Sequence, residues 1–136
     1  MAGMAAQLLA QYMRDKEKKV RITEDGALET GWNINGGEIY IYIVFDKDDA
    51  RVHFRGSKFA RVPQEKYDKM YKVLNECNGT YSYIKFELDE QRGEVFAHDD
   101  AIIQLDSCGP ECYEIIQRMV AVVEDALPKL MKVVWA

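Results

Sequence analysis

Residues 38–45 have the sequence EIYIYIVF, and their side chains alternate with the period of two that is typical of a β-strand. Ile39, Ile41 and Ile43 fall on one face of this strand, and Tyr40 and Tyr42 fall on the other. Both faces are therefore apolar, but one of them carries phenol groups. The pattern predicts a central strand with one face in the core and the other face partly covered.

The segments around this strand extend it into a sheet. In residues 50–55, Val52 and Phe54 are expected to point inward, and Arg51, His53 and Arg55 share the opposite face. The polar residues 46–49 connect the two strands as a hairpin, and turn residues near 25–26, 35–37 and 91–93 separate further extended segments. The expected extended segments are 20–23, 28–32, 38–45, 50–55, 81–88 and 94–103.

Three segments have the spacing of amphipathic helices, at residues 3–18, at 63–77 and from 109 onward. Asn78-Gly79 is expected to end the second helix, and Pro128 predicts a kink or an end in the third. We therefore predict one domain over residues 1–136, of the α+β class. It has an antiparallel sheet with helices packed on it, in the order α-β-β-β-α-β-β-α.

Composition and charge exclude several classes of function. The 136 residues suffice for one domain, and 48% of them are hydrophobic, as in ordinary globular proteins. The net charge of −5 argues against binding to nucleic acid or to anionic membranes, because both begin with a basic surface. The longest apolar run, 39–45, is far shorter than the roughly 20 residues that span a bilayer. No signal peptide is expected, and three cysteines, an odd number, favour the reducing cytoplasm.

A family resemblance rests on three motifs: LNECN at 74–78, YIKFEL at 83–88 and GEVFA at 93–97, followed by a long acidic and apolar helix. Over roughly residues 4–134 this order resembles the YbjN-type family, described as bacterial sensory-transduction regulators. The resemblance implies a fold similar to that of type III secretion chaperones, small cytoplasmic proteins that hold other proteins. The family has no agreed catalytic residues, so the resemblance implies no catalytic site, cofactor or metal. It implies a non-enzymatic protein-binding module, chaperone-like or a regulatory adaptor, and a homodimer.

Tyrosines expected on strands are the candidate partner-binding residues, because tyrosine is favoured at protein interfaces. They are Tyr40, Tyr42, Tyr81 and Tyr83. Aromatic residues on a sheet also stack RNA bases, but the basic and glycine–aromatic signature of such modules is absent. Packing in the core under a helix is the competing interpretation of all four.

A second functional hypothesis is a small redox or metal-binding protein that uses Cys108, Cys112 and His98. With Gly109 as cap, Cys112 would occupy the third position of the last helix, where the positive helix end can lower the pKa of a thiol. However, the spacing differs from that of thioredoxin-like motifs, and zinc needs about four ligands. The alternative is that both cysteines are small packing residues.

Overall fold

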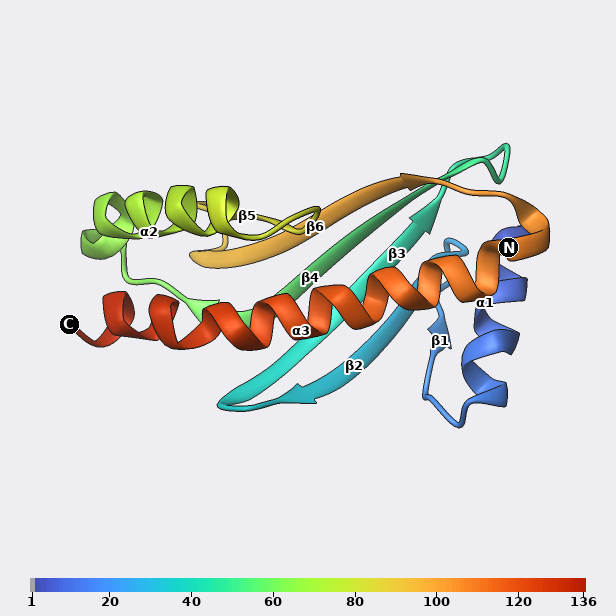
Figure 1. The fold of residues 1–136 in the computed structure, drawn as a ribbon, viewed down its shortest axis with the longest axis horizontal. Coiled ribbons are helices and arrows are strands. Elements are labelled where there is room, and N and C mark those ends of the chain that lie inside the picture. Colours follow the sequence, from blue (N-terminus) through green and yellow to red (C-terminus); the bar gives the residue numbers. More distant parts are fainter. Residues whose placement is uncertain (1) are drawn as a thin grey trace.

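The computed structural model describes residues 2–136, in which three α-helices pack with a six-stranded antiparallel sheet (Figure 1). The strands follow one another across the sheet in the order β1-β2-β3-β4-β6-β5. The α+β class is confirmed. Four strands precede the second helix, one more than in the predicted order, because the expected extended segment 20–23 forms the short strand β1. The elements are α1 (Met4–Asp15), β1 (Arg21–Ile22), β2 (Leu28–Ile34), β3 (Gly37–Phe45), β4 (Arg51–Arg61), α2 (Tyr67–Thr80), β5 (Lys85–Asp89), β6 (Glu94–Ile102) and α3 (Cys108–Trp135).

The strand β3 lies between β2 and β4, as the EIYIYIVF pattern predicts. Ile39, Ile41 and Ile43 are at most 1% exposed and form the centre of the core, whereas Tyr40 lies on the other face and is 42% exposed. The turn into β3 contains Gly36 at a φ of +88°, a backbone conformation that glycine adopts without steric cost. Alternation along this strand therefore fixes which face of the whole sheet is buried.

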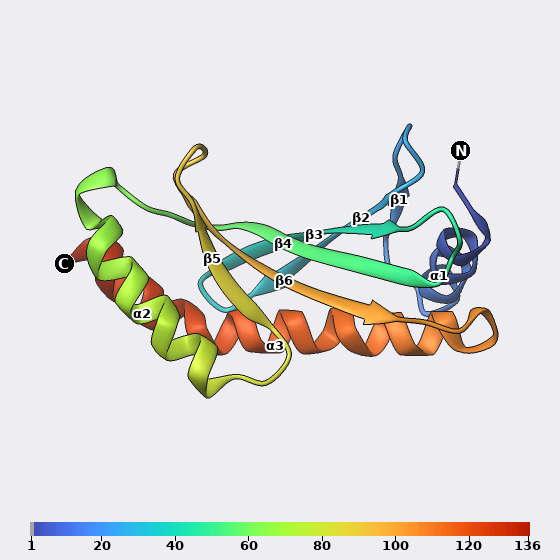
Figure 2. The ribbon, with the colours of Figure 1, turned by 90° about the horizontal axis from the view of Figure 1, so that it is seen from above.

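The helix α3 runs along the buried face, with α1 at its N-terminal end and α2 at its C-terminal end (Figure 2). Two glycines allow this close packing. A Cβ on Gly56 of β4 would lie 2.6 Å from Ile39 Cδ1 and 2.9 Å from Met119 Sδ. A Cβ on Gly109 of α3 would lie 2.9 Å from Tyr12 Cβ, so this glycine brings α1 and α3 together. Within residues 2–136, no helix covers the opposite face of the sheet.

The second helix differs from its prediction at both ends. A 3₁₀ turn at Gln64–Lys66 precedes α2, and the helix continues through Asn78-Gly79 to Thr80. Asn78 does not stop the helix, because its side chain bonds the backbone of Phe86 in β5. Lys85 Nζ instead donates to the carbonyl oxygens of Asn78 and Tyr81, at 2.7 and 2.8 Å, and so satisfies the helix end.

The third helix also differs. It begins at Cys108 and passes through Pro128 to Trp135. Of the two alternatives predicted for this proline, a kink or an end, the end is therefore wrong. Leu127, Leu130 and Val133, on either side of Pro128, are all buried. Continuous burial of this apolar stripe therefore outweighs the backbone hydrogen bond that a proline removes.

Candidate functional site

The uncovered face of the sheet, which we call the open face, carries alternate residues of β2, β3, β4 and β6. Two turns project above it, Thr23–Ala27 between β1 and β2 and Asp89–Gly93 between β5 and β6 (Figure 2). Arg51 and His53 of β4 lie on this face, as predicted, and are exposed. The open face is therefore a shallow surface between two raised turns, with aromatic, basic and acidic side chains exposed together.

One pocket of about 310 Å³ lies on the open face. Its lining combines three cations with two tyrosine rings and a hydroxyl group. We call it the open-face pocket, and its residues are Glu29, Tyr40, Ile41, Tyr42, Arg55, Ser57, Lys58 and Arg92. Two of the four predicted partner-binding tyrosines, Tyr40 and Tyr42, therefore belong to one site.

Lys58 reaches the pocket because β4 is irregular at this point. The register of β4 against β6 shifts between Gly56 and Ala60, and Lys58 has a φ of +68°. Such a bulge bends a strand and redirects a side chain. Here it directs Lys58 Nζ to 5.2 Å from the ring centroid of Tyr40, a cation–π distance.

Arg55 is held in a fixed position beside the pocket. Its guanidinium carbon lies 3.7 Å from the ring centroid of Phe96, and its Nη2 donates to Asp89 Oδ2 at 3.0 Å. Arg92 Nε lies 4.0 Å from the same oxygen. Burial raises the pKa of Asp89, but the backbone N–H of Arg92 and the Arg55 guanidinium outweigh it, so the pKa lies below its usual value. Asp89 is therefore ionised and orients two of the three cations of the pocket.

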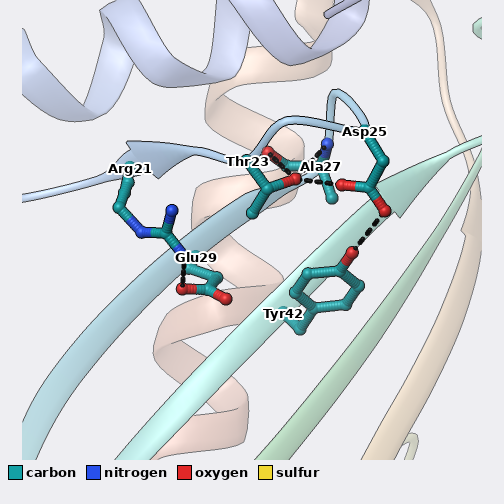
Figure 3. A network of polar contacts seen from close by, with 6 residues as sticks. All are labelled: Arg21, Thr23, Asp25, Ala27, Glu29 and Tyr42. Atoms are coloured by element: carbon teal, nitrogen blue, oxygen red, sulfur yellow. Dashed lines mark hydrogen bonds and ion pairs between the residues drawn. The ribbon is translucent and has the colours of Figure 1, made fainter.

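Tyr42 joins the floor of the pocket to the β1–β2 turn (Figure 3). Its hydroxyl donates to Asp25 Oδ2 at 2.9 Å, and the Thr23 hydroxyl donates to the other carboxylate oxygen. The backbone N–H of Ala27 in turn donates to Thr23 Oγ1 at 3.0 Å. The hydrogen bonds from Thr23 and Tyr42 lower the pKa of Asp25, and the bond to Asp25 raises the pKa of Tyr42. These hydrogen bonds thus hold the Tyr42 side chain in place on the floor of the pocket.

Tyr81 and Tyr83 do not lie on strands, so that part of the prediction is wrong. The chain leaves α2 at Tyr81 and turns sharply, with Tyr83 at a φ of +68° and the backbone N–H of Ile84 donating to Ser82 O. Tyr81 bonds Asp125 and Lys129 of α3, and Tyr83, which is 66% exposed, lies 4.5 Å from the Arg118 guanidinium of α3. The two tyrosines therefore contact α3, away from the open-face pocket.

The structure separates the residues of the redox or metal hypothesis. Cys108 and Cys112 are completely buried where α1 meets α3, with their sulfur atoms 4.0 Å apart, whereas His98 lies on β6 and pairs with Glu87 at 2.7 Å. The prediction of a lowered pKa for Cys112 is wrong, because its hydrogen bond with Cys108 and burial raise it. Among residues 2–136, no three His, Cys, Asp or Glu side chains lie close enough together to hold a metal ion.

Sequence reasoning missed Ser57 and Lys58 as pocket residues, because it ended the second strand of the first hairpin at residue 55. It missed Arg92 because this residue lies in the turn of the second hairpin, and no local pattern brings that turn to the pocket. One signal was available. The adjacent apolar pair Phe59-Ala60 breaks the alternation that Val52 and Phe54 begin, and both members of the pair are buried. An interrupted period of two is what a bulge produces.

None of the helices in residues 2–136 combines the length and the apolar character needed to cross a membrane.

Comparison with solved structures identifies the class of fold. The chain is similar to YbjN from E. coli, with a TM-score of 0.64 and 13% sequence identity over 89% of each chain. It is also similar to a chain of the ExsC–ExsE complex (TM-score 0.60, 13% identity, 96% of this chain and 97% of that one). A third similar structure is the HopA1–SchA chaperone–effector complex (TM-score 0.56, 12% identity, 95% and 94%). The molecule therefore has the α+β fold of the type III secretion chaperones.

The sequence places the chain more narrowly. The YbjN family model, described as "Putative bacterial sensory transduction regulator", matches residues 5–126. The chain therefore belongs to the YbjN family, and the resemblance drawn from the LNECN, YIKFEL and GEVFA motifs is confirmed. A comparison with curated protein sequences gave no match.

Proposed function

We propose that this protein is a non-enzymatic protein-binding module, a chaperone-like protein or regulatory adaptor, and that it holds its partner on the open face of the sheet. The observation that carries the proposal is the open-face pocket, where Tyr40 and Tyr42 lie beside the cations Arg55, Lys58 and Arg92. Tyrosine and arginine are enriched at the centres of protein interfaces. The described residues that surround this pocket supply contact area and charge, with no nucleophile activated by a neighbouring base.

The comparisons support the same class of function. The chain shares its fold with structures described as complexes, HopA1–SchA and ExsC–ExsE, and its family is described in terms of sensory transduction. A partner with acidic side chains fits the pocket best. Lys58 and Arg92 are exposed in its lining, and the one carboxylate of Asp89 is shared by Arg55 and Arg92, so it does not balance all three positive charges. We propose a reducing compartment, the cytoplasm, as the site of action, in keeping with three cysteines that form no disulfide among residues 2–136.

A matched pair of tyrosines tests the proposal. A photo-crosslinking amino acid is placed at Tyr40 or at Tyr83, both exposed, and the protein is expressed in its native host. We expect one partner protein to crosslink at position 40 and not at position 83. The substitution Lys58→Glu should abolish the crosslink at position 40, because it replaces a cation of the pocket by an anion. Equal crosslinking at both positions, or crosslinking only at position 83, would contradict the assignment to the open face.

The homodimer implied by the resemblance is part of this proposal and has its own measurement. Light scattering coupled to size-exclusion chromatography should give twice the 15.7 kDa of one chain at micromolar concentration. A mass of 15.7 kDa at every concentration would show that the module acts as a monomer, and it would leave the open-face assignment intact.

A further inference from the structure

A second surface lies where α2 and the last turns of α3 run side by side, at the end of the molecule that contains the C-terminus (Figures 1 and 2). The facing sides of the two helices enclose a groove of about 490 Å³, which we call the helix groove. Its lining residues recur at intervals of three and four, so each helix contributes one straight stripe. They are Lys69, Lys72, Val73, Glu76, Cys77 and Thr80 of α2, Lys129, Lys132 and Val133 of α3, and Ala136, which follows α3.

The floor of the helix groove is apolar. Val133 is 8% exposed, Cys77 is 1% exposed and Val73 is half-buried. Burial raises the pKa of the Cys77 thiol, which is therefore neutral and acts as an apolar surface. Such a floor gains from contact with aliphatic side chains, because that contact removes apolar area from water.

The rim of the helix groove is basic in a protein whose net charge is −5. Four exposed lysines, two from each helix, surround the floor, and Glu76 is the only carboxylate side chain in the lining. In the described part of the chain, none of these lysines belongs to an ion pair. Lys129 Nζ lies 3.3 Å from the Tyr81 hydroxyl, a neutral partner. That hydroxyl in turn bonds Asp125, so the charge of Lys129 is partly balanced. With four lysines and one glutamate, the side chains of the rim still carry a net positive charge next to an apolar surface.

We propose that the helix groove binds an amphipathic helix of a partner protein, whose apolar stripe is flanked by aspartate or glutamate. The stripe from Lys69 to Thr80 spans roughly 16 Å, about three helical turns, which suits anchors at i, i+3, i+4 and i+7. Acidic flanks would complement the four lysines. The proposal rests on the proposed function as a protein-binding module, and it adds the kind of segment that the module recognises.

A second copy of this chain fits the groove poorly. A twofold interface brings the same patch of both subunits together, so four lysines would face four lysines. Like charges that face one another across a buried interface repel, and this repulsion disfavours the pairing of two copies through the groove. A separate partner with acidic side chains has no such conflict.

The test uses the whole protein and two synthetic peptides of about 14 residues, roughly 20 Å long as helices. Both carry leucine at the i, i+3, i+4 and i+7 positions. One has glutamate on its flanks, and the other has lysine there. Fluorescence anisotropy should show that the glutamate peptide binds more tightly by at least about tenfold, with an affinity that falls as salt is added. Amide resonances of residues 69–80 and 129–136 should shift in NMR spectra upon binding.

Charge reversal on the rim provides the matched control. The double substitution K72E/K132E should weaken binding of the glutamate peptide by about tenfold or more. K19E/K47E reverses two exposed lysines outside the groove and should leave the affinity unchanged. Equal binding of both peptides, or equal effects of the two double variants, would overturn the proposal.

Three further outcomes distinguish the alternatives. If sodium laurate shifts the same resonances while neither peptide does, the groove is an acyl-chain site and the proposal is wrong. Crosslinking at Tyr40 is measured separately, so its loss would refute the open-face function without affecting the peptide result. Conversely, failure of the peptide with intact crosslinking at Tyr40 would refute only the helix groove as a docking site.

Discussion

The hydroxyl of Tyr42 donates a hydrogen bond of 2.9 Å to Asp25, and this bond joins the centre of the sheet to a turn 17 residues earlier in the chain (Figure 3). The turn contains Gly26 at a φ of +87°. The side chains of Thr23 and Asp25 make the main hydrogen bonds that hold this turn in place. Tyr42 therefore controls how closely the β1–β2 turn approaches the open-face pocket.

Removal of this hydroxyl should loosen the turn without unfolding the protein. In the variant Tyr42→Phe, the ring is retained, so its contacts on the sheet persist while the bond to Asp25 is lost. We expect amide hydrogen exchange in residues 23–27 to accelerate several-fold, because local opening becomes easier. Exchange in β3 and β4 should be unchanged. Equal protection of residues 23–27 in both proteins would show that the bond contributes nothing to the position of the turn.

The same bond predicts a pH dependence. The hydrogen bonds from Thr23 and Tyr42 hold the pKa of Asp25 below its ordinary value of 3.8 in the folded protein. The ionised carboxylate therefore stabilises the fold fully above about pH 4, and this contribution is lost as the pH falls through the folded pKa. Carboxyl NMR titration should give Asp25 a pKa below 3.8 in the wild type and a higher pKa in Tyr42→Phe. A pKa of Asp25 that is the same in both proteins would contradict the predicted role of Tyr42.

Two glycines in helices should respond to alanine in opposite directions. In Gly109→Ala, the new Cβ would lie 2.9 Å from Tyr12 Cβ and Cγ, so α1 and α3 must separate. Overpacking of this kind costs about 1–3 kcal/mol, more than the helix propensity that alanine gains. Gly79 is exposed in α2 with open space around its Cβ position, and Gly79→Ala should stabilise the fold by up to about 1 kcal/mol. Urea unfolding measures both, and destabilisation of similar size in both variants would refute the packing argument.

The elements that could be predicted from the sequence are those whose burial follows a local period. The alternation in EIYIYIVF predicts β3 and its buried face, and the apolar stripes predict the three helices. The ends of the helices could not be predicted in the same way, because contacts with residues distant in the sequence determine where a helix ends. Pro128 stays inside α3 since the helix packs on the sheet on both sides of it, and α2 continues past Asn78 since that side chain bonds β5.

The candidate site could be predicted only in part, for the same reason. Parity along β3 and β4 places Tyr40, Tyr42 and Arg55 on one face. No local sequence pattern predicts that Arg92 lies beside these residues, because it belongs to the turn of the second hairpin. Lys58 reaches the pocket only because of the bulge in β4. Tyr83 illustrates the reverse error, since the alternation of residues 81–88 suggested a strand where the backbone turns sharply.

The buried cysteines should be inert in the native protein. Cys77, Cys108 and Cys112 are each at most 1% exposed, so a reagent in solution does not reach their sulfur atoms. The pKa values of Cys77 and Cys112 are raised, and although the hydrogen bond with Cys112 lowers the pKa of Cys108, that thiol is completely buried. Ellman's reagent at pH 8 should titrate no thiol on the time scale of seconds, and three thiols in denaturant. The variant Lys47→Cys, with an exposed position in the β3–β4 turn, should give one immediate equivalent. Rapid reaction of the native wild type would favour the redox hypothesis.

Asn78, the last residue of the LNECN motif, gives the motif a physical role. Its amide nitrogen donates to Phe86 O at 3.0 Å, and its carbonyl oxygen accepts from Phe86 N at 2.7 Å. Because β5 is an edge strand, these are backbone groups that β6 does not satisfy, and Asn78 covers them. Asn78→Ala should therefore lower the free energy of unfolding by about 1–3 kcal/mol. Asn75→Ala, at an exposed position of the same motif and helix, should change it by less than about 0.5 kcal/mol. If urea unfolding gives equal values for the two variants, the motif owes its stabilising effect to helix α2 alone and not to its link with the sheet.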